Sequence, residues 1–139
     1  MAKEKQDIDN ANEQEEVPAV EILSEVNVPL EIREEIARKI DELKAKNKLR
    51  RVFAVIVEGE EGDSKPLYIA YLQRPNLIHF SQYMSFVQKD LVQANKMLAQ
   101  NVFLAGDKEL IDDDELFLYG TMPQLTHLID SRNGELLKR

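Results

Sequence analysis

The 139-residue sequence contains no cysteine and no tryptophan, and it has only two histidines. The lack of cysteine excludes disulfide bonds, thiolate chemistry and zinc sites built on cysteine. No apolar run approaches the ~20 residues that a membrane-spanning helix needs. The N-terminus is charged and lacks the apolar core of a signal peptide. These absences predict a cytoplasmic protein that does not bind a membrane.

Basic residues are fewer than acidic ones: the chain has 18 Lys and Arg and 26 Asp and Glu, which gives a formal net charge of −8. Residues 1–26 hold eight of the acidic and two of the basic side chains, and therefore carry most of the excess. An acidic chain without a basic face is not expected to bind nucleic acid. The composition predicts a largely disordered acidic tail over residues 1–26 and a single folded domain over residues 27–139.

The end of this tail is apolar, since Val, Ile and Leu make up half of residues 17–26. Such a segment either packs on its own domain or adds to a partner. Packing on its own domain is the favoured interpretation, because chain ends are often held in this way.

The first part of the domain predicts a helix followed by a β-hairpin. A helix with Pro29 at its first position extends to about Asn47 and carries one apolar stripe. Residues 51–58 and 67–72 are rich in β-branched and aromatic side chains and are separated by a polar turn, which favours an antiparallel hairpin. Both faces of the hairpin are apolar. We therefore expect helices or another subunit to cover it.

Three further helices are expected. Asn76 caps one that ends near Gln88, and Asp90 caps the next, which Gly106 terminates. Asp112, paired with Glu115 in a capping box, begins the last helix. Pro123 should bend that helix, which is expected to end at residues 133–134. The apolar spacing continues across the proline, so the helix should have one inward stripe, made of Leu118, Met122, Leu125 and Ile129. The fold class is therefore α+β, with an antiparallel hairpin and about four helices.

Catalytic signals are absent from the sequence. His79 and His127 lie on different predicted helices and have no ligand-spaced companion. No glycine-rich phosphate loop and no nucleophile elbow is present. We expect no catalytic residues, no cofactor and no enzymatic activity.

One acidic cluster has two interpretations. Asp107 and Glu109 precede the run Asp112-Asp113-Asp114-Glu115, and carboxylates at this density can hold Mg²⁺ or Ca²⁺. The spacing lacks the pattern of a calcium loop, and carboxylates at a helix N-terminus are stabilised without a metal. Helix capping is favoured, so no metal site is predicted; a small metal-binding or enzymatic domain is an alternative.

The predicted helices carry more apolar surface than one core needs. In the helix after Asn76, Leu77, Phe80, Tyr83, Met84 and Val87 form one side, which leaves Ile78 and Phe86 on a second apolar surface. In the helix after Asp90, Met97 and Phe103 widen the inner face. This surplus predicts either a partner-binding or self-associating surface at Ile78, Phe86, Met97 and Phe103, or helices that pack on both sides of a thin core.

Several motifs resemble a known group of proteins. They are Tyr71-Leu72-Gln73-Arg74-Pro75 at a strand end, residues 100–109 (Gln-Asn-Val-Phe-Leu-Ala-Gly-Asp-Lys-Glu) at a helix end, and residues 113–118 (Asp-Asp-Glu-Leu-Phe-Leu) at the start of the last helix. Together they resemble small proteins from phages and prophages of gut bacteria that are similar to tail assembly chaperones. The resemblance covers about residues 51–130, and Gly120, Pro123 and Gly134 depart from the regular last helix that it implies.

The resemblance implies a non-enzymatic protein that binds the long helical tape-measure protein, or another tail protein, during phage tail assembly. It implies no catalytic residues, and its host-cell location would be the cytoplasm. A structural or packaged virion protein of a tailed phage is the alternative in this setting. Homo-oligomerisation is compatible with both roles.

Overall fold

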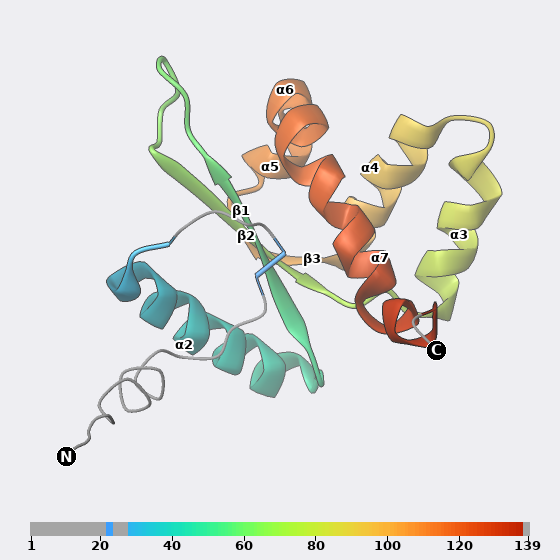
Figure 1. Cartoon of the computed structure of the whole chain (residues 1–139), viewed down its shortest axis with the longest axis horizontal. Helices are drawn as coiled ribbons and strands as arrows, with labels where there is room; N and C mark the ends of the chain where they lie inside the picture. The colour runs from blue at the N-terminus through green and yellow to red at the C-terminus, as the bar shows by residue number, and fades with distance from the viewer. Residues whose placement is uncertain (1–21, 24–27, 138–139) are drawn as a thin grey trace.

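The computed structural model describes residues 22–23 and 28–137, with side chains described as far as Ile129. Except for Ile22 and Leu23, the predicted acidic tail therefore lies outside the described residues. Within this range the protein is an α+β fold, with a three-stranded antiparallel sheet and helices on both of its faces (Figure 1).

The predicted hairpin is confirmed and forms the centre of the sheet. Strand β1 (Val52–Glu58) pairs with β2 (Leu67–Gln73) in an uninterrupted antiparallel register that places Phe53 opposite Leu72. Strand β3 (Phe103–Gly106) pairs with the other edge of β2, with a register shift at Tyr71 and Leu72. The strand order is β1-β2-β3.

One face of the sheet is covered by α2 (Leu30–Asn47). Ile36, Ile40 and Leu43 are buried at the spacing predicted for an amphipathic helix, and they pack against the side chains of Val52, Ala54, Ile56 and Tyr71. Pro29 precedes the helix rather than occupying its first position. The helix ends where Lys48 adopts a left-handed conformation and donates its amide to the carbonyl of Lys44.

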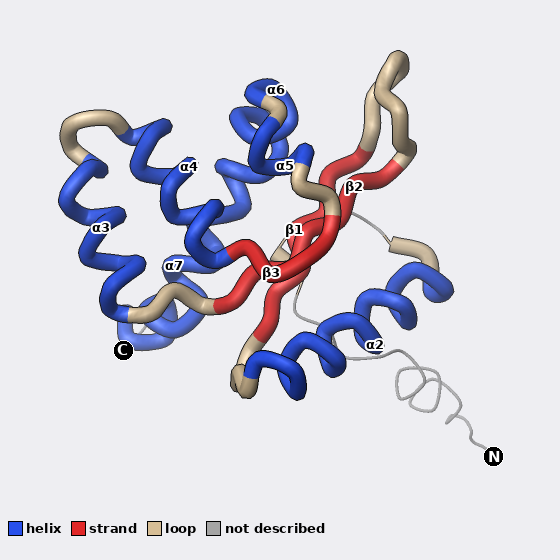
Figure 2. The backbone as a smooth tube through the Cα atoms, turned by 180° about the vertical axis from the view of Figure 1, so that it is seen from behind, coloured by secondary structure: helices blue, strands red, loops and turns tan. Residues whose placement is uncertain are grey.

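The opposite face is covered by α4 (Leu91–Val102), α5 (Glu109–Asp112), a π-helical turn η1 (Phe117–Thr121) and α7 (Met122–Leu137), as Figure 2 shows from behind. Their buried side chains include Leu98, Val102, Leu110, Ile111, Phe117, Leu125 and Leu128, packed on Phe53, Val55, Tyr68, Ala70 and Leu72. The apolar hairpin is thus covered by helices of its own chain, as one of the two interpretations predicted.

The helix that Asp90 caps ends at Val102, so the prediction that it continues to Gly106 was wrong. Phe103 has extended dihedral angles of −65° and 130°, and the chain turns into β3. The edge of β2 that faces away from β1 can form backbone hydrogen bonds with an extended segment. The stabilisation from this long-range pairing exceeds the local preference of these residues for a helix. Gly106 does adopt a positive φ of 109°, but at the end of a strand.

The last helical region also differs from its prediction. Asp113, not Asp112, is the cap, because its carboxylate accepts the amides of Glu115 and Leu116 at the start of α6 (Asp114–Leu116). The wider turn η1 then precedes Pro123 and shifts the inward face. Thr121 is fully buried, whereas Leu118, expected to face inward, is 38% exposed. Helix α7 continues past residues 133–134, since one glycine costs a helix only about 1 kcal/mol.

Candidate interaction surface

The helical hairpin of α3 (Leu77–Val87) and α4 stands to one side of the sheet (Figure 1). Asn76 begins α3 as predicted, because its Oδ1 accepts the amide of His79 at 2.8 Å. The Nδ1 atom of His79 accepts the amide of Asn76 at 3.3 Å, which completes a capping box. The imidazole of His79 therefore has a structural role at the beginning of this helix.

Helix α3 packs mainly against α4 and has no buried residue. On the inner side of α3, Tyr83 packs against the core. The ring centroids of Tyr83 and Phe80 are 6.1 Å apart. The side-chain amide of Asn101 on α4 donates to Oε1 of Gln82 at 2.8 Å. These contacts hold one side of α3 and leave the rest of its circumference in solvent.

Large apolar side chains occupy the solvent-exposed part of this hairpin. Leu77 is 81% exposed, Ile78 66% and Met84 52%. Together with Phe86, Leu91 and Val92 they form what we term the α3–α4 surface. The sequence of α3 has no Asp, Glu, Lys or Arg, in a chain where such residues make up 32%. An apolar, uncharged helix of this exposure is typical of a protein-binding surface.

The four residues predicted to contact a partner fall in different places. Ile78 and Phe86 belong to the α3–α4 surface. Met97 lies half-buried on α4. Phe103 is in β3 rather than on a helix, half-buried against the core, with the ammonium of Lys108 5.8 Å from its ring centroid.

The sequence pattern also grouped two exposed residues with the main apolar side of α3. Leu77 and Met84 were placed on one side with Phe80, Tyr83 and Val87, yet both are more than half exposed. A helix with one main neighbour buries only a narrow stripe, so part of its apolar surface remains exposed. Periodicity identifies such a stripe but does not show how many neighbours the helix has.

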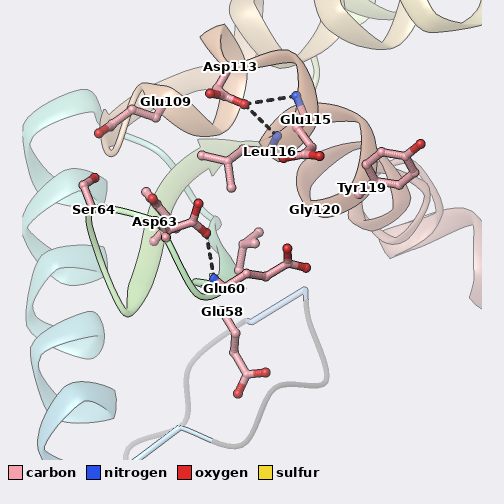
Figure 3. A pocket seen from close by; sticks show the side chains of 13 residues that line it. Glu58, Glu60, Asp63, Ser64, Glu109, Asp113, Glu115, Leu116, Tyr119 and Gly120 are labelled. Carbon is pink, nitrogen blue, oxygen red and sulfur yellow. Dashed lines mark hydrogen bonds between the residues drawn. The ribbon is translucent and has the colours of Figure 1, made fainter.

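A hollow of about 450 Å³ lies between the β1–β2 loop and the segment from α5 to η1 (Figure 3). Six of the thirteen residues that line it are acidic: Glu58, Glu60, Asp63, Glu109, Asp113 and Glu115. Two of these carboxylates stabilise the local backbone: Asp63 accepts the amide of Glu60 at 2.7 Å, and Asp113 caps α6. Within the described residues, no group of three or more His, Cys, Asp or Glu side chains is arranged to hold a metal ion.

Several other members of the acidic cluster also have protein partners. The ammonium of Lys65 bonds to Asp107 and lies 3.3 Å from Glu109, and that of Lys96 lies 3.5 Å from Asp114. The hydrogen bond to Asp107, more than the other contacts, raises the pKa of Lys65 above its usual value. Capping, the interpretation favoured from the sequence, holds for Asp113, whereas the ion pairs of Asp107, Glu109 and Asp114 were not predicted.

Comparisons with protein-family models, with curated proteins and with solved structures gave no significant match to this chain. The α3–α4 surface is therefore interpreted from its own physical chemistry. Within the part of the chain that the structure describes, no helix combines the length and the apolar character needed to cross a membrane.

Proposed function

We propose that this protein is a non-enzymatic binding protein of the tail-assembly-chaperone type, which holds a helical tape-measure or other tail protein through the α3–α4 surface. The observation that carries the proposal is α3 itself: a helix without charged residues and without a buried residue, fixed to the fold by one side. The sequence resemblance to small phage proteins supports the choice of client.

The energetics of the surface favour a helical client. Burial of apolar area stabilises a complex by roughly 25 cal/mol per Å², and no charge on α3 has to be desolvated. An amphipathic client helix can present apolar side chains at the matching spacing of three and four residues. The charge of −8 elsewhere on the chain opposes non-specific aggregation of the exposed apolar surface.

Gene position and co-purification test the proposal. A long helical tape-measure reading frame is expected next to the gene for this chain, and its product should co-purify with this protein after co-expression. Ile78→Asp is expected to reduce capture of the client at least ten-fold. Ala45→Asp is the matched control, because it adds the same charge at an exposed position of α2, across the sheet, and capture should be unchanged.

Two outcomes would contradict the proposal. Equal capture by wild type and Ile78→Asp would exclude the α3–α4 surface as the client site. Detection of the protein by mass spectrometry in purified phage particles, at a stoichiometry like that of a structural component, would assign it instead to the virion.

A further inference from the structure

Basic side chains gather at the end of the sheet where β1 begins and β2 ends. Lys46, Lys48 and Arg50 are exposed between the last turn of α2 and the first residue of β1. Residues 43–57 contain no Asp or Glu. This part of the surface is therefore positive, in a chain whose formal net charge is −8.

Two arginines extend the positive region. Val52 pairs with Gln73, so the residues just before β1 and just after β2 are neighbours. The guanidinium of Arg51 lies 5.4 Å from the ring centroid of Phe53, and that of Arg74 lies 5.8 Å from the same centroid. We term this region the basic end, and its residues are Lys46, Lys48, Arg50, Arg51 and Arg74.

The dipole of α2 explains only part of this charge. Lys46 lies in the last turn of the helix, where the negative end of the dipole stabilises a cation. Lys48 follows the helix and Arg50 lies two residues farther on, and the dipole effect falls off within the last turn. Among the described residues, no carboxylate forms an ion pair with Lys48 or Arg50. Their charges are therefore available to an anionic group.

The direction of Ile22 and Leu23 brings the N-terminal part of the chain to the basic end. Ile22 forms a parallel bridge with Ala54, so its N-terminal side is directed toward the start of β1. Arg50 precedes Ala54 by four residues, which is about 13 Å along an extended chain. Glu16 precedes Ile22 by six residues, which can span up to about 20 Å. The residues up to Glu16 can therefore reach the basic end.

Residues 7–16 supply the opposite charge. They lie outside the described residues, and their sequence has no Lys or Arg. Their five carboxyl side chains equal in number the cations of the basic end, and they are Asp7, Asp9, Glu13, Glu15 and Glu16. Charge complementarity and reach thus identify the same segment.

We propose that residues 7–16 dock on the basic end of the same chain, where their carboxylates neutralise its cations. Each exposed ion pair is weak on its own. The attachment through Ile22 keeps the segment at an effective concentration in the millimolar range, so several weak pairs act together. The docked segment also denies the basic end to external polyanions. This contact is independent of the α3–α4 surface, so either assignment can fail alone.

Paramagnetic relaxation enhancement tests the contact in the full chain. Because the sequence has no cysteine, Asn10→Cys gives a single site for a spin label. At about 0.02 M salt the label should broaden the amide NMR signals of Asn47 and Leu49 and leave those of α6, at the other end of the sheet, unchanged (Figure 1). The broadening should disappear at about 0.5 M salt, because exposed charges are then screened.

Two double variants separate a specific contact from general attraction. Lys48→Gln with Arg50→Gln should reduce the broadening by about two-fold or more, because both cations lie in the basic end. Lys89→Gln with Lys108→Gln is the matched control, since it removes the same charge at two exposed positions elsewhere, and it should leave the broadening unchanged. Conversion of the five carboxyl side chains of residues 7–16 to amides should abolish the broadening.

Four outcomes would overturn the proposal. They are the absence of broadening at low salt, an equal loss in the two double variants, and broadening that persists in the five-amide variant. Broadening of isotope-labelled, unmodified chains by spin-labelled ones in a mixture would be the fourth, because the segment would then dock on a second copy. A single-stranded DNA 20-mer that bound wild type as tightly as the five-amide variant would also count against it, since the basic end would then be open to an external polyanion.

Discussion

The ammonium group of Lys65 donates a hydrogen bond to Oδ1 of Asp107, and so joins residues 42 positions apart in the sequence. The second carboxylate oxygen of Asp107, Oδ2, accepts a hydrogen bond from the backbone amide of Ile69 at 2.9 Å. The backbone amide of Asp107 in turn donates to the carbonyl of Ile69 at 2.8 Å. Asp107 therefore ties the end of β3 to β2 and to the loop before it. Asp107 belongs to the acidic cluster for which metal binding was the less favoured interpretation, and in the structure it connects β3 to β2.

Asp107→Asn should destabilise the fold by about 1–2 kcal/mol, because it removes the charge that Lys65 binds and weakens the bond from the amide of Ile69. Urea unfolding monitored by circular dichroism measures the loss. Glu109→Gln is the matched control: Glu109 also contacts Lys65, but its side chain is 46% exposed and it should cost less than about 0.5 kcal/mol. Equal losses for the two variants would show that Asp107 has no special role.

Stability should fall at alkaline pH because of Tyr71. Burial, followed by the nearby charges of Glu35 and Asp107, raises the pKa of Tyr71 to about 12. The unfolded chain, with a tyrosine pKa near 10, ionises first. The stabilising contribution is therefore complete below pH 10 and is lost between pH 10 and 12. Urea midpoints across this range should decline less steeply for Tyr71→Phe than for wild type, and parallel curves would contradict the assignment.

The ion pair between Lys65 and Asp107 should also lower stability at alkaline pH, and mutation of Lys65 distinguishes this contribution from that of Tyr71. Because the pKa of Lys65 is raised in the folded state, its contribution is present below the unfolded value of 10.5 and is lost as pH rises through the folded value. The difference in unfolding free energy between wild type and Lys65→Met should thus shrink above pH 10.5. A difference that stayed constant up to pH 12 would exclude a contribution from the charge of Lys65.

Gly106→Ala should be more harmful than Gly62→Ala, although both glycines have positive φ. A Cβ atom at Gly106 would lie 2.4 Å from the carbonyl oxygen of Ile69, whereas one at Gly62 would meet nothing within 4 Å. Backbone strain alone predicts about 1 kcal/mol for Gly62→Ala. The added clash against backbone predicts about 3 kcal/mol for Gly106→Ala, with loss of β3 pairing. Thermal unfolding of the two variants provides the comparison, and equal melting temperatures would contradict the close approach of β3 to β2.

Ile78→Ser should leave the free energy of unfolding within about 0.5 kcal/mol of wild type, because Ile78 is 66% exposed. Leu98→Ala on the neighbouring helix should cost about 3 kcal/mol, since Leu98 is buried under the sheet. Urea unfolding measures both values. A large loss for Ile78→Ser would mean that the α3–α4 surface stabilises the monomer and is not available for a partner.

The sequence predicted those elements whose signals are local. The stripe of α2 follows from periodicity, and the hairpin follows from β-branched and aromatic strands on either side of a polar turn. Asn76 and Asp90 follow from capping chemistry. Strand β3 was missed because the apolar residues 103–106 continue a helical pattern equally well, and the free edge of β2 decides between the two structures. Asp112 and Asp113 are chemically alike, so spacing alone did not identify the cap.

The exposed apolar surface of α3 was predicted in part. Ile78 and Phe86 were assigned to an outer surface because they fall off the main stripe of α3. Leu77 and Met84 were grouped with the main apolar side of α3. Their exposure could not be predicted, because a pattern does not reveal that α3 has one main neighbour. The contact of Ile22 with β1 depends on pairing between segments 32 residues apart, and composition predicted only that this apolar segment would pack on its own domain.

The turn η1 has a consequence for how relatives of this chain could be recognised. A π-helical turn is equivalent to one residue inserted into an α-helix, and each residue rotates a helix by about 100°. Deleting one residue within Phe117–Thr121 would convert this turn to regular helix and would rotate Leu125 and Leu128 away from the sheet. Relatives should therefore either keep this extra residue or show a single-residue gap here together with a shifted apolar stripe downstream. An alignment that places the gap elsewhere would join residues that occupy different faces of the last helix.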